Sequence, residues 1–157
     1  MPPQPFIDID SLDMNRLVAD QDEIYSLLPH RHEFMRLDRI CLLDTDLGVM
    51  AGYVDLRDDD FWVRGHIPGR PIFPGVMMIE TAAQLVSYYT MKNQEGEGFL
   101  GFGGVDGVKF RGSVHPGQRV VMLGRMVEIR KRRCIGETQA FVDGKIVYEG
   151  TITGMWI

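Results

Sequence analysis

One long helix with apolar residues on almost every side is the feature that most constrains this fold. The segment from Val76 to about Asn93 directs apolar side chains nearly all the way around a helix axis, and a helix of that kind is buried. Three prolines, Pro68, Pro71 and Pro74, precede it and exclude a regular helix or a central strand over residues 57–75. The rest of the chain is therefore expected to surround this helix.

The remaining pattern is mostly that of strands. A short helix is expected from Asp20, capped by Asp20 or Asp22 and ended by Pro29. Beyond residue 98 the apolar period becomes two, and Asp143-Gly144 is typical of a tight hairpin turn, while Asp106-Gly107 is a weaker, competing hairpin signal. The strands that we expect are Met35–Asp44, Gly48–Leu56, Leu100–Phe110, Arg119–Ile129, Cys134–Val142 and Ile146–Trp156.

These elements predict an α+β fold in which one long buried helix is wrapped by a mostly antiparallel sheet of about six strands. The 157 residues suit one domain of ordinary size. We assign residues 21–157 to that domain. Residues 1–20, which show no clear period, form an N-terminal extension.

Charge and cysteine content narrow the class of protein. Lys and Arg number 17 against 22 Asp and Glu, for a net charge of −5, which disfavours non-specific nucleic-acid binding. No apolar run is long enough to span a bilayer and the first residues do not resemble a signal peptide, so we expect a cytoplasmic protein. Cys41 and Cys134 fit no zinc-binding spacing and are most simply two buried thiols, although a single disulfide between them stays open.

The proline-rich segment and the helix after it concentrate the residues that can carry chemistry. His66 can transfer protons near neutral pH. Glu80 lies just over one turn into an apolar helix, where desolvation is expected to raise its pKa. Gly75 precedes that helix, so its backbone N–H can face a carbonyl oxygen at the positive end of the helix dipole. A base, an acid and an oxyanion site together are what proton abstraction beside a carbonyl requires.

Each of these residues alone also has a common structural explanation. A histidine in a loop is usually a surface residue, and a glutamate in an apolar helix usually makes a buried ion pair. The segment His30-Arg31-His32-Glu33 could suggest a metal site, but it lacks the HExxH spacing and a partner cysteine. The combination of His66, Glu80 and the three-proline loop is much more specific.

The segment from His66 through Pro74-Gly75 to Glu80 and Gln84 resembles the signature of the 3-hydroxyacyl-[acyl carrier protein] dehydratases of the FabZ type, in the hot-dog superfamily. The resemblance covers about residues 24–154. It includes Leu28–Phe34, Val105–Arg111 and Ala140–Lys145. Glu80 favours the FabZ type, because the isomerising FabA type usually carries Asp there. The chain departs from the family pattern at Ile67, His32-Glu33 and Arg36, which bears on chain-length preference more than on the reaction.

The resemblance implies roles for individual residues. His66 and Glu80 would be a catalytic pair drawn from opposite subunits of a dimer. The N–H of Gly75 would bind the thioester oxygen, the backbone of Ile72 would contact the reacting end, and Gln84 would support the acid. Candidates for an acyl tunnel, which could equally be core, are Phe73, Met77, Met78 and Ile79. Candidates for docking an acidic carrier protein are Lys109, Arg111, Arg130, Lys131, Arg132 and Arg133, although the run from Arg130 to Arg133 is more simply a solvated hairpin end.

The expected activity is therefore that of a hydro-lyase that dehydrates (3R)-3-hydroxyacyl-[acyl carrier protein] to the trans-2-enoyl product in fatty-acid biosynthesis. The family needs no metal and no organic cofactor, and its homodimers can assemble further into a trimer of dimers. The sequence does not decide which of His66 and Glu80 acts at C2. The alternatives are an enoyl hydratase or isomerase acting on coenzyme A or polyketide-type carriers, and a non-catalytic acyl-binding protein of the same fold.

Overall fold

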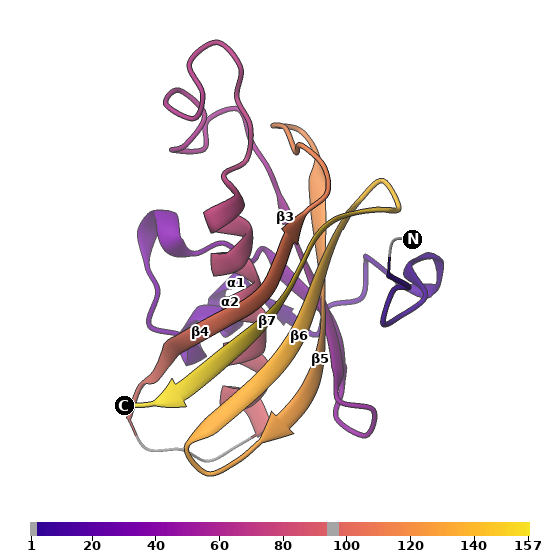
Figure 1. The fold of residues 1–157 in the computed structure, drawn as a ribbon, viewed down its shortest axis with the longest axis vertical. Coiled ribbons are helices and arrows are strands. Elements are labelled where there is room, and N and C mark those ends of the chain that lie inside the picture. The colour runs from indigo at the N-terminus through magenta and orange to yellow at the C-terminus, as the bar shows by residue number, and fades with distance from the viewer. Residues whose placement is uncertain (1–2, 94–97) are drawn as a thin grey trace.

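A computed structural model describes residues 3–93 and 98–157, and its strands form one sheet (Figure 1). Every neighbouring pair of strands is antiparallel, in the order β1-β2-β3-β5-β6-β7-β4. The strands are β1 (Ala19–Asp20), β2 (Arg39–Asp44), β3 (Val49–Asp55), β4 (Leu100–Phe110), β5 (Arg119–Ile129), β6 (Arg133–Val142) and β7 (Lys145–Trp156). The helices are α1 (Gln21–Leu27) and α2 (Gly75–Asn93), with 3-10 turns at Ile9–Ser11 and His32–Phe34.

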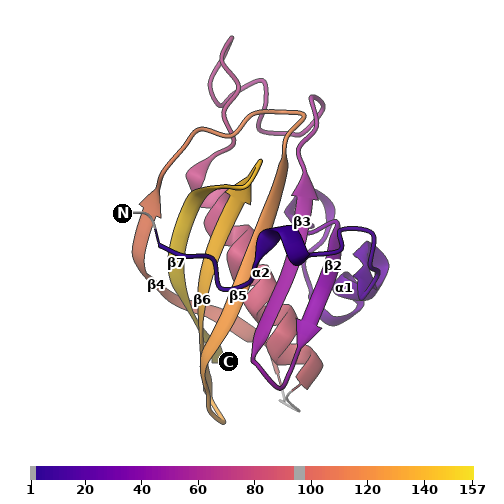
Figure 2. The same cartoon turned by 90° about the vertical axis from the view of Figure 1, so that its right-hand side faces the viewer.

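The long helix α2 lies against the inner face of this sheet, as expected of a hot-dog fold (Figure 2). Its buried face joins residues of every long strand in the main core, including Leu85, Val86 and Tyr88. A Cβ atom at Gly136 of β6 would lie only 2.8 Å from the Val86 side chain. Glycine at that strand position therefore lets the helix approach the sheet closely.

The structure adds one strand to the predicted sheet and decides two alternatives that the sequence leaves open. The sheet has seven strands rather than about six, because Ala19–Asp20 in the N-terminal extension pairs with β2. Asp20, not Asp22, caps α1 by accepting the Glu23 N–H at 2.9 Å. Asp106-Gly107 does not make a hairpin: β4 continues through it with a register shift, and Gly107 takes a positive φ of 61°. The left-handed residue is absorbed as a bulge in a long strand.

The helix α2 is not covered on all sides within the chain, which corrects the expectation of complete burial. Apart from Gly75 at its start and Lys92 and Asn93 at its end, its partly or fully exposed positions recur at helical spacing, at Val76, Ile79, Glu80, Ala83, Ser87 and Met91. Residues three and four apart lie on one side of a helix, so they form a single stripe. The sheet and α1 cover the rest of the helix and leave this stripe, which includes Glu80, accessible.

The outer face of the sheet carries a second, smaller core. The N-terminal segment crosses that face on the side opposite to α2 (Figure 2). It packs Phe6, Ile7, Ile9, Leu12 and Met14 against the apolar outer residues Cys41, Ala51, Tyr53, Val121, Leu123 and Phe141. Gln139 ties it down, because the side-chain oxygen of Gln139 accepts the Phe6 N–H at 3.0 Å and its amide donates to Gln4 O at 2.9 Å.

Two further features of the chain bear on its environment. Both thiols, Cys41 and Cys134, are free and buried. They lie in different cores, Cys134 beneath α2 and Cys41 beneath the N-terminal segment. Among the described residues, no helix is long and apolar enough to cross a membrane.

Truncation of the chain up to Met14 is expected to uncover the outer apolar face and to lower the free energy of unfolding by about 2–4 kcal/mol, because several partly buried apolar side chains lose their partners. Thermal unfolding measures the loss, and light scattering reports any association through the uncovered face. Leu47→Ala, which removes an apolar side chain that is 73% exposed, should change neither. A truncated chain with unchanged stability would show that the segment is not held in solution.

Candidate active site

The loop that carries His66 is closed by hydrogen bonds between its two arms. The Ile72 N–H donates to His66 O at 2.9 Å, and inside this pair Arg70 N–H donates to Ile67 O at 2.8 Å. At its end the Phe73 N–H donates to Val114 O at 2.8 Å. The loop projects beyond the first turn of α2 (Figure 1). Backbone pairing thus holds a segment that its prolines keep out of regular structure.

The His66 ring is fixed in one tautomer. Its Nδ1 lies 2.7 Å from Ile72 O. A carbonyl oxygen can only accept, so Nδ1 carries the proton and the lone pair of the neutral ring is on Nε2. His66 is exposed, which leaves Nε2 open to a substrate. The same contact occupies the Ile72 backbone, whose N–H and C=O both face His66.

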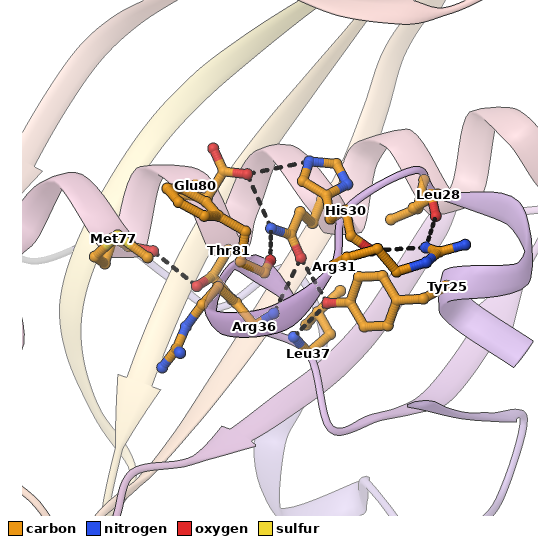
Figure 3. A network of polar contacts seen from close by, with 11 residues as sticks. Tyr25, Leu28, His30, Arg31, Arg36, Leu37, Met77, Glu80 and Thr81 are labelled. Carbon is orange, nitrogen blue, oxygen red and sulfur yellow. Dashed lines mark hydrogen bonds and ion pairs between the residues drawn. The ribbon is translucent and has the colours of Figure 1, made fainter. Parts of the chain in front are cut away.

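Glu80 lies on the accessible stripe of α2 and faces His30, in the segment that follows α1 (Figure 3). The two side chains are 29% and 25% exposed, and His30 Nε2 is 3.2 Å from Glu80 Oε1. His30 Nδ1 is buried and has no partner within the part of the chain that the structure describes, so a proton there would be a buried donor without an acceptor. The carboxylate can only accept, so the ring nitrogen that faces it, Nε2, carries the proton that this contact donates. The sequence pattern indicates His30 only as a candidate metal ligand and gives no local signal of this contact with Glu80.

Gln84 connects Glu80 to the body of the protein through hydrogen bonds. Its amide nitrogen donates to Glu80 Oε1 at 2.9 Å and to Phe34 O at 2.7 Å. Its oxygen accepts from the Tyr25 hydroxyl at 2.6 Å and from the Arg36 N–H at 3.3 Å. A supporting contact from Gln84 to Glu80 was expected. Tyr25 was not singled out, because a tyrosine on the apolar face of a short helix carries no local signal of a functional role.

The pKa of Glu80 is held below its ordinary value, which corrects the expectation that it is raised. Hydrogen bonding from His30 is the largest cause, and Gln84 adds to it. Burial acts in the opposite direction, as the sequence analysis supposed. Donors to a carboxylate stabilise its charged form, and here two donors converge on one oxygen and outweigh desolvation. Both donors come from tertiary or helical contacts that the composition of α2 does not reveal.

Gly75 is the first residue of α2, where backbone N–H groups have no partner within the helix. A Cβ atom at this position would lie 2.7 Å from the ring of Phe110, at the end of β4. Glycine here therefore allows β4 to close against the start of the helix. The Phe110 side chain is still 50% exposed.

Arg36, one of the departures from the family pattern, is buried behind this site with 6% exposure. Its guanidinium lies 5.8 Å from the ring centroids of both Phe61 and Phe73. It donates to Glu33 O at 3.1 Å and lies 3.8 Å from Asp60. The Arg36 guanidinium thus lies beside the ring of the loop residue Phe73.

The residues expected to line an acyl tunnel lie mostly in the core. Phe73 and Met78 are each 2% exposed, Met77 is buried and Ile79 is partly buried. A cavity of about 90 Å³ adjoins Glu80 instead and is lined also by Ala83, Gly101 and Gly154. A second cavity, of about 290 Å³, shares His30, Ser87, Phe99 and Leu100 with it. The two cavities run along the accessible stripe of α2.

The basic residues expected to dock a carrier protein fall at opposite ends of the sheet. Lys109 and Arg111 flank Phe110, near Gly75 and the His66 loop. Residues 130–133 turn from β5 to β6, at the end where Arg133 pairs with Met155. Arg130 and Arg133 are paired with Glu128, and Arg111 with Glu149. The structure therefore does not bring the two groups into one patch on a chain.

Within residues 3–93 and 98–157, no three His, Cys, Asp or Glu side chains are grouped to hold a metal ion. His30 turns to Glu80 instead. His66 and Glu80 each have their own partners within the chain, Ile72 for His66 and His30 with Gln84 for Glu80.

Comparison with known proteins adds to this geometry. A family model described as a FabA-like domain matches residues 28–151. The 3-hydroxyacyl-[acyl-carrier-protein] dehydratase FabZ of Campylobacter jejuni is 36% identical over 143 residues, covering 88% of this chain and 97% of that protein. The protein of the same name from Streptococcus equi subsp. zooepidemicus is 36% identical over 137 residues, covering 87% and 96%.

Solved structures show the same fold at low sequence identity. A chain of the dehydratase heterocomplex ApeI:P from Xenorhabdus doucetiae has a TM-score of 0.73 at 14% identity, covering 88% of this chain and 91% of that one. The Escherichia coli PaaI protein has a TM-score of 0.61 at 12% identity, covering 86% and 88%.

Replacing His30 is expected to raise the pKa of Glu80. In His30→Phe the larger donor to the carboxylate is lost while burial remains, so the pKa should rise from below its ordinary value to near or above it. Titration of the ¹³C-labelled Glu80 carboxyl group by NMR, assigned by its absence in Glu80→Gln, measures this shift. His30→Gln keeps an N–H donor and should keep most of the lowering.

The same contact predicts a pH dependence of stability. Because the folded pKa of Glu80 is depressed, its contribution to the free energy of unfolding is complete above the unfolded pKa and is lost as pH falls through the folded one. His30→Phe should remove that acid-side loss. An unchanged Glu80 titration in this variant would show that the His30 contact does not hold the carboxylate.

Proposed function

This chain belongs to the FabA-like family and is a hydro-lyase of the 3-hydroxyacyl-[acyl-carrier-protein] dehydratase type, acting in fatty-acid biosynthesis, and we propose that it uses His66 and Glu80 from two subunits to eliminate water. The observation that carries the proposal is the complementary state of the two groups. His66 offers a free lone pair on an exposed Nε2, and Glu80 offers a half-buried carboxyl beside an apolar cavity.

His66 is the base in this mechanism. Its Nε2 takes a proton from C2 of the 3-hydroxyacyl thioester, and the hydrogen bond from Nδ1 to Ile72 O supports the positive ring that results. The electron pair left at C2 is shared with the thioester oxygen. The Gly75 N–H, at the positive end of α2, faces that oxygen and stabilises its negative charge. The pair then forms the C2–C3 double bond as the hydroxyl leaves C3.

Glu80 is the acid that converts this hydroxyl to water. In the free enzyme its lowered pKa keeps the carboxyl ionised at neutral pH. An acyl chain that displaces water from the adjoining cavity increases the desolvation of Glu80, and that effect raises its pKa. Glu80 therefore takes up a proton as substrate binds and gives it to the C3 hydroxyl. Return of the C2 proton from His66 to solvent completes the cycle.

A homodimer formed along β4 explains why one chain leaves both groups accessible. β4 is an edge strand of the sheet, and Phe102 and Phe110 on it are 57% and 50% exposed. Val76, on the stripe of α2, is 71% exposed. Pairing of two β4 strands would extend the sheet and cover these apolar residues. We place His66 of one subunit opposite Glu80 of the other, with a trimer of dimers as the higher assembly.

The two cavities along α2 are the path that we assign to the acyl chain. They begin at Glu80 and continue past Ser87 toward Met91, and their lining is largely apolar. The carrier protein would approach the opposite, exposed end of the site. There Lys109 and Arg111 adjoin the His66 loop, whose Arg64 and Arg70 are also exposed, and a basic rim suits an acidic cytoplasmic carrier.

Turnover of a crotonyl or 3-hydroxybutyryl thioester, followed by enoyl absorbance, tests the assignment of the two residues. His66→Ala and Glu80→Gln should each lower kcat by at least about a hundredfold, because each removes a proton-transfer group. Glu137→Gln, in a surface ion pair with Arg125, is the control and should be fully active. Preference for carrier protein over coenzyme A separates the dehydratase from the hydratase alternative, and no turnover by the wild type would favour a non-catalytic acyl-binding protein.

The shared site predicts complementation between the two inactive variants. After His66→Ala and Glu80→Gln are unfolded and refolded together, half of the dimers are mixed and each has one intact site, so activity should return to about a quarter of the wild-type level. Recovery would not occur if both residues of a site came from one chain. Light scattering that shows a monomer would contradict the same arrangement.

Filling the cavity at Ser87 should restrict the enzyme to substrates with shorter acyl chains. Ser87→Leu places a larger side chain where the two cavities meet, so kcat/KM for long-chain thioesters should fall by about tenfold or more while that for four-carbon substrates stays within about twofold. Ser87→Ala keeps the space and is the matched control. An equal loss for short and long chains, with the dimer intact, would place the acyl chain elsewhere.

A further inference from the structure

Tyr25 connects the buried end of α1 to the side chains that hold Glu80 (Figure 3). Its ring is 3% exposed. Its hydroxyl lies 2.6 Å from Gln84 Oε1 and accepts the Leu37 N–H at 2.8 Å. The ring also meets His30 edge-on, with the centroids 6.4 Å apart. Tyr25 thus contacts both of the residues that bind the Glu80 carboxylate.

The direction of each hydrogen bond in this network follows from its donors. The backbone N–H of Leu37 can only donate, so the Tyr25 oxygen accepts there and its single proton is directed to Gln84 Oε1. Phe34 O can only accept, so it binds the amide nitrogen of Gln84. The amide of Gln84 is therefore held from both sides in one orientation, with an N–H toward Glu80.

We propose that Tyr25 is a positioning residue that acts through Gln84 to keep an N–H donor on Oε1 of Glu80, so that Oε2 is the oxygen that exchanges its proton with the substrate. The inference rests on the proposed function for the substrate step. The orientation of the amide does not depend on it. Oε1 already receives Gln84 and His30, so a proton on the carboxyl belongs on Oε2. Without Tyr25, only Phe34 O and the longer contact from the Arg36 N–H, at 3.3 Å, hold the amide against a turn of its oxygen toward the carboxylate.

The surroundings keep Tyr25 in the form that the network needs. Burial raises the pKa of Tyr25 well above its usual range, against smaller lowering effects from the Leu37 and Arg36 backbone and the Arg36 charge. The hydroxyl therefore remains a donor at every working pH. The charges of Arg36 and Asp38 act on the pKa of Tyr25. The titratable group that acts on the pKa of Glu80 is His30. His30 is thus the neighbour whose own titration must be followed in parallel.

The test compares Tyr25→Phe with Tyr88→Phe. Tyr88, on α2, is fully buried and its hydroxyl has no hydrogen-bond partner among the described residues, so it is a matched control that lies outside the network. In Tyr25→Phe, NMR titration of the labelled Glu80 carboxyl should show a raised pKa, and kcat should fall by about fivefold with KM within about twofold. Tyr88→Phe should leave both unchanged. A Glu80 titration unchanged in a folded Tyr25→Phe protein would overturn the proposal, since a merely structural role lowers only the melting temperature.

A double-mutant cycle shows whether Tyr25 acts through Gln84. In the Gln84→Met background, Tyr25→Phe should cause no further shift in the pKa of Glu80, and an additive shift would contradict the relay. If Tyr25→Phe fails to fold, a measurement on the wild-type protein still tests the proposal. The two Gln84 side-chain amide protons, assigned by their loss in Gln84→Met, should be resolved and exchange with solvent at least tenfold more slowly than those of exposed glutamines; fast exchange would refute a fixed amide. These titrations need no substrate, so they stand apart from a failure of the dehydratase assay.

Discussion

Apolar contact between α2 and the inner face of the sheet holds the other parts of this molecule in their places. Leu85, Val86 and Tyr88 are almost completely buried in that contact, and Gly136 of β6 removes the side chain that would keep the helix away. Because the sheet covers only part of the helix, the remaining stripe must carry Glu80 and the positions on either side of it. The packing that stabilises the fold thus also decides which side of α2 meets a substrate or a second chain.

The polar network around Glu80 depends on this packing in a specific way. A carboxylate on a mostly apolar helix would normally resist ionisation, yet here two side chains donate to one of its oxygens. Gln84 comes from the same helix one turn later. Tyr25 comes from α1, and His30 comes from the segment after it. The Asp20 cap and Pro29 keep α1 short. The opposing effects of burial and hydrogen bonding leave a carboxyl whose pKa lies below its ordinary value.

The sheet has apolar residues on both faces, and the chain covers them differently. The inner face is covered by α2, and much of the outer face by the N-terminal segment through Phe6, Ile9 and Met14. The edge at β4 stays open, with Phe102 and Phe110 exposed. Both faces are therefore largely covered within the chain, whereas the apolar residues at the β4 edge are not. This division is consistent with dimers that join along the edge rather than across the sheet faces.

Much of this could be predicted from the sequence, because its signals are local. The all-round apolar pattern of residues 76–93 predicts the central helix, the period of two predicts the long strands, and the prolines before Gly75 predict the irregular loop that carries His66. The tautomer of His66, the donors to Glu80 and the cover over the outer face could not be predicted, because each depends on residues far apart in the chain. The sequence by itself determined which groups are available for proton transfer. Only the tertiary structure decided the charge that Glu80 carries, because that depends on the balance between burial and donors that folding brings to it.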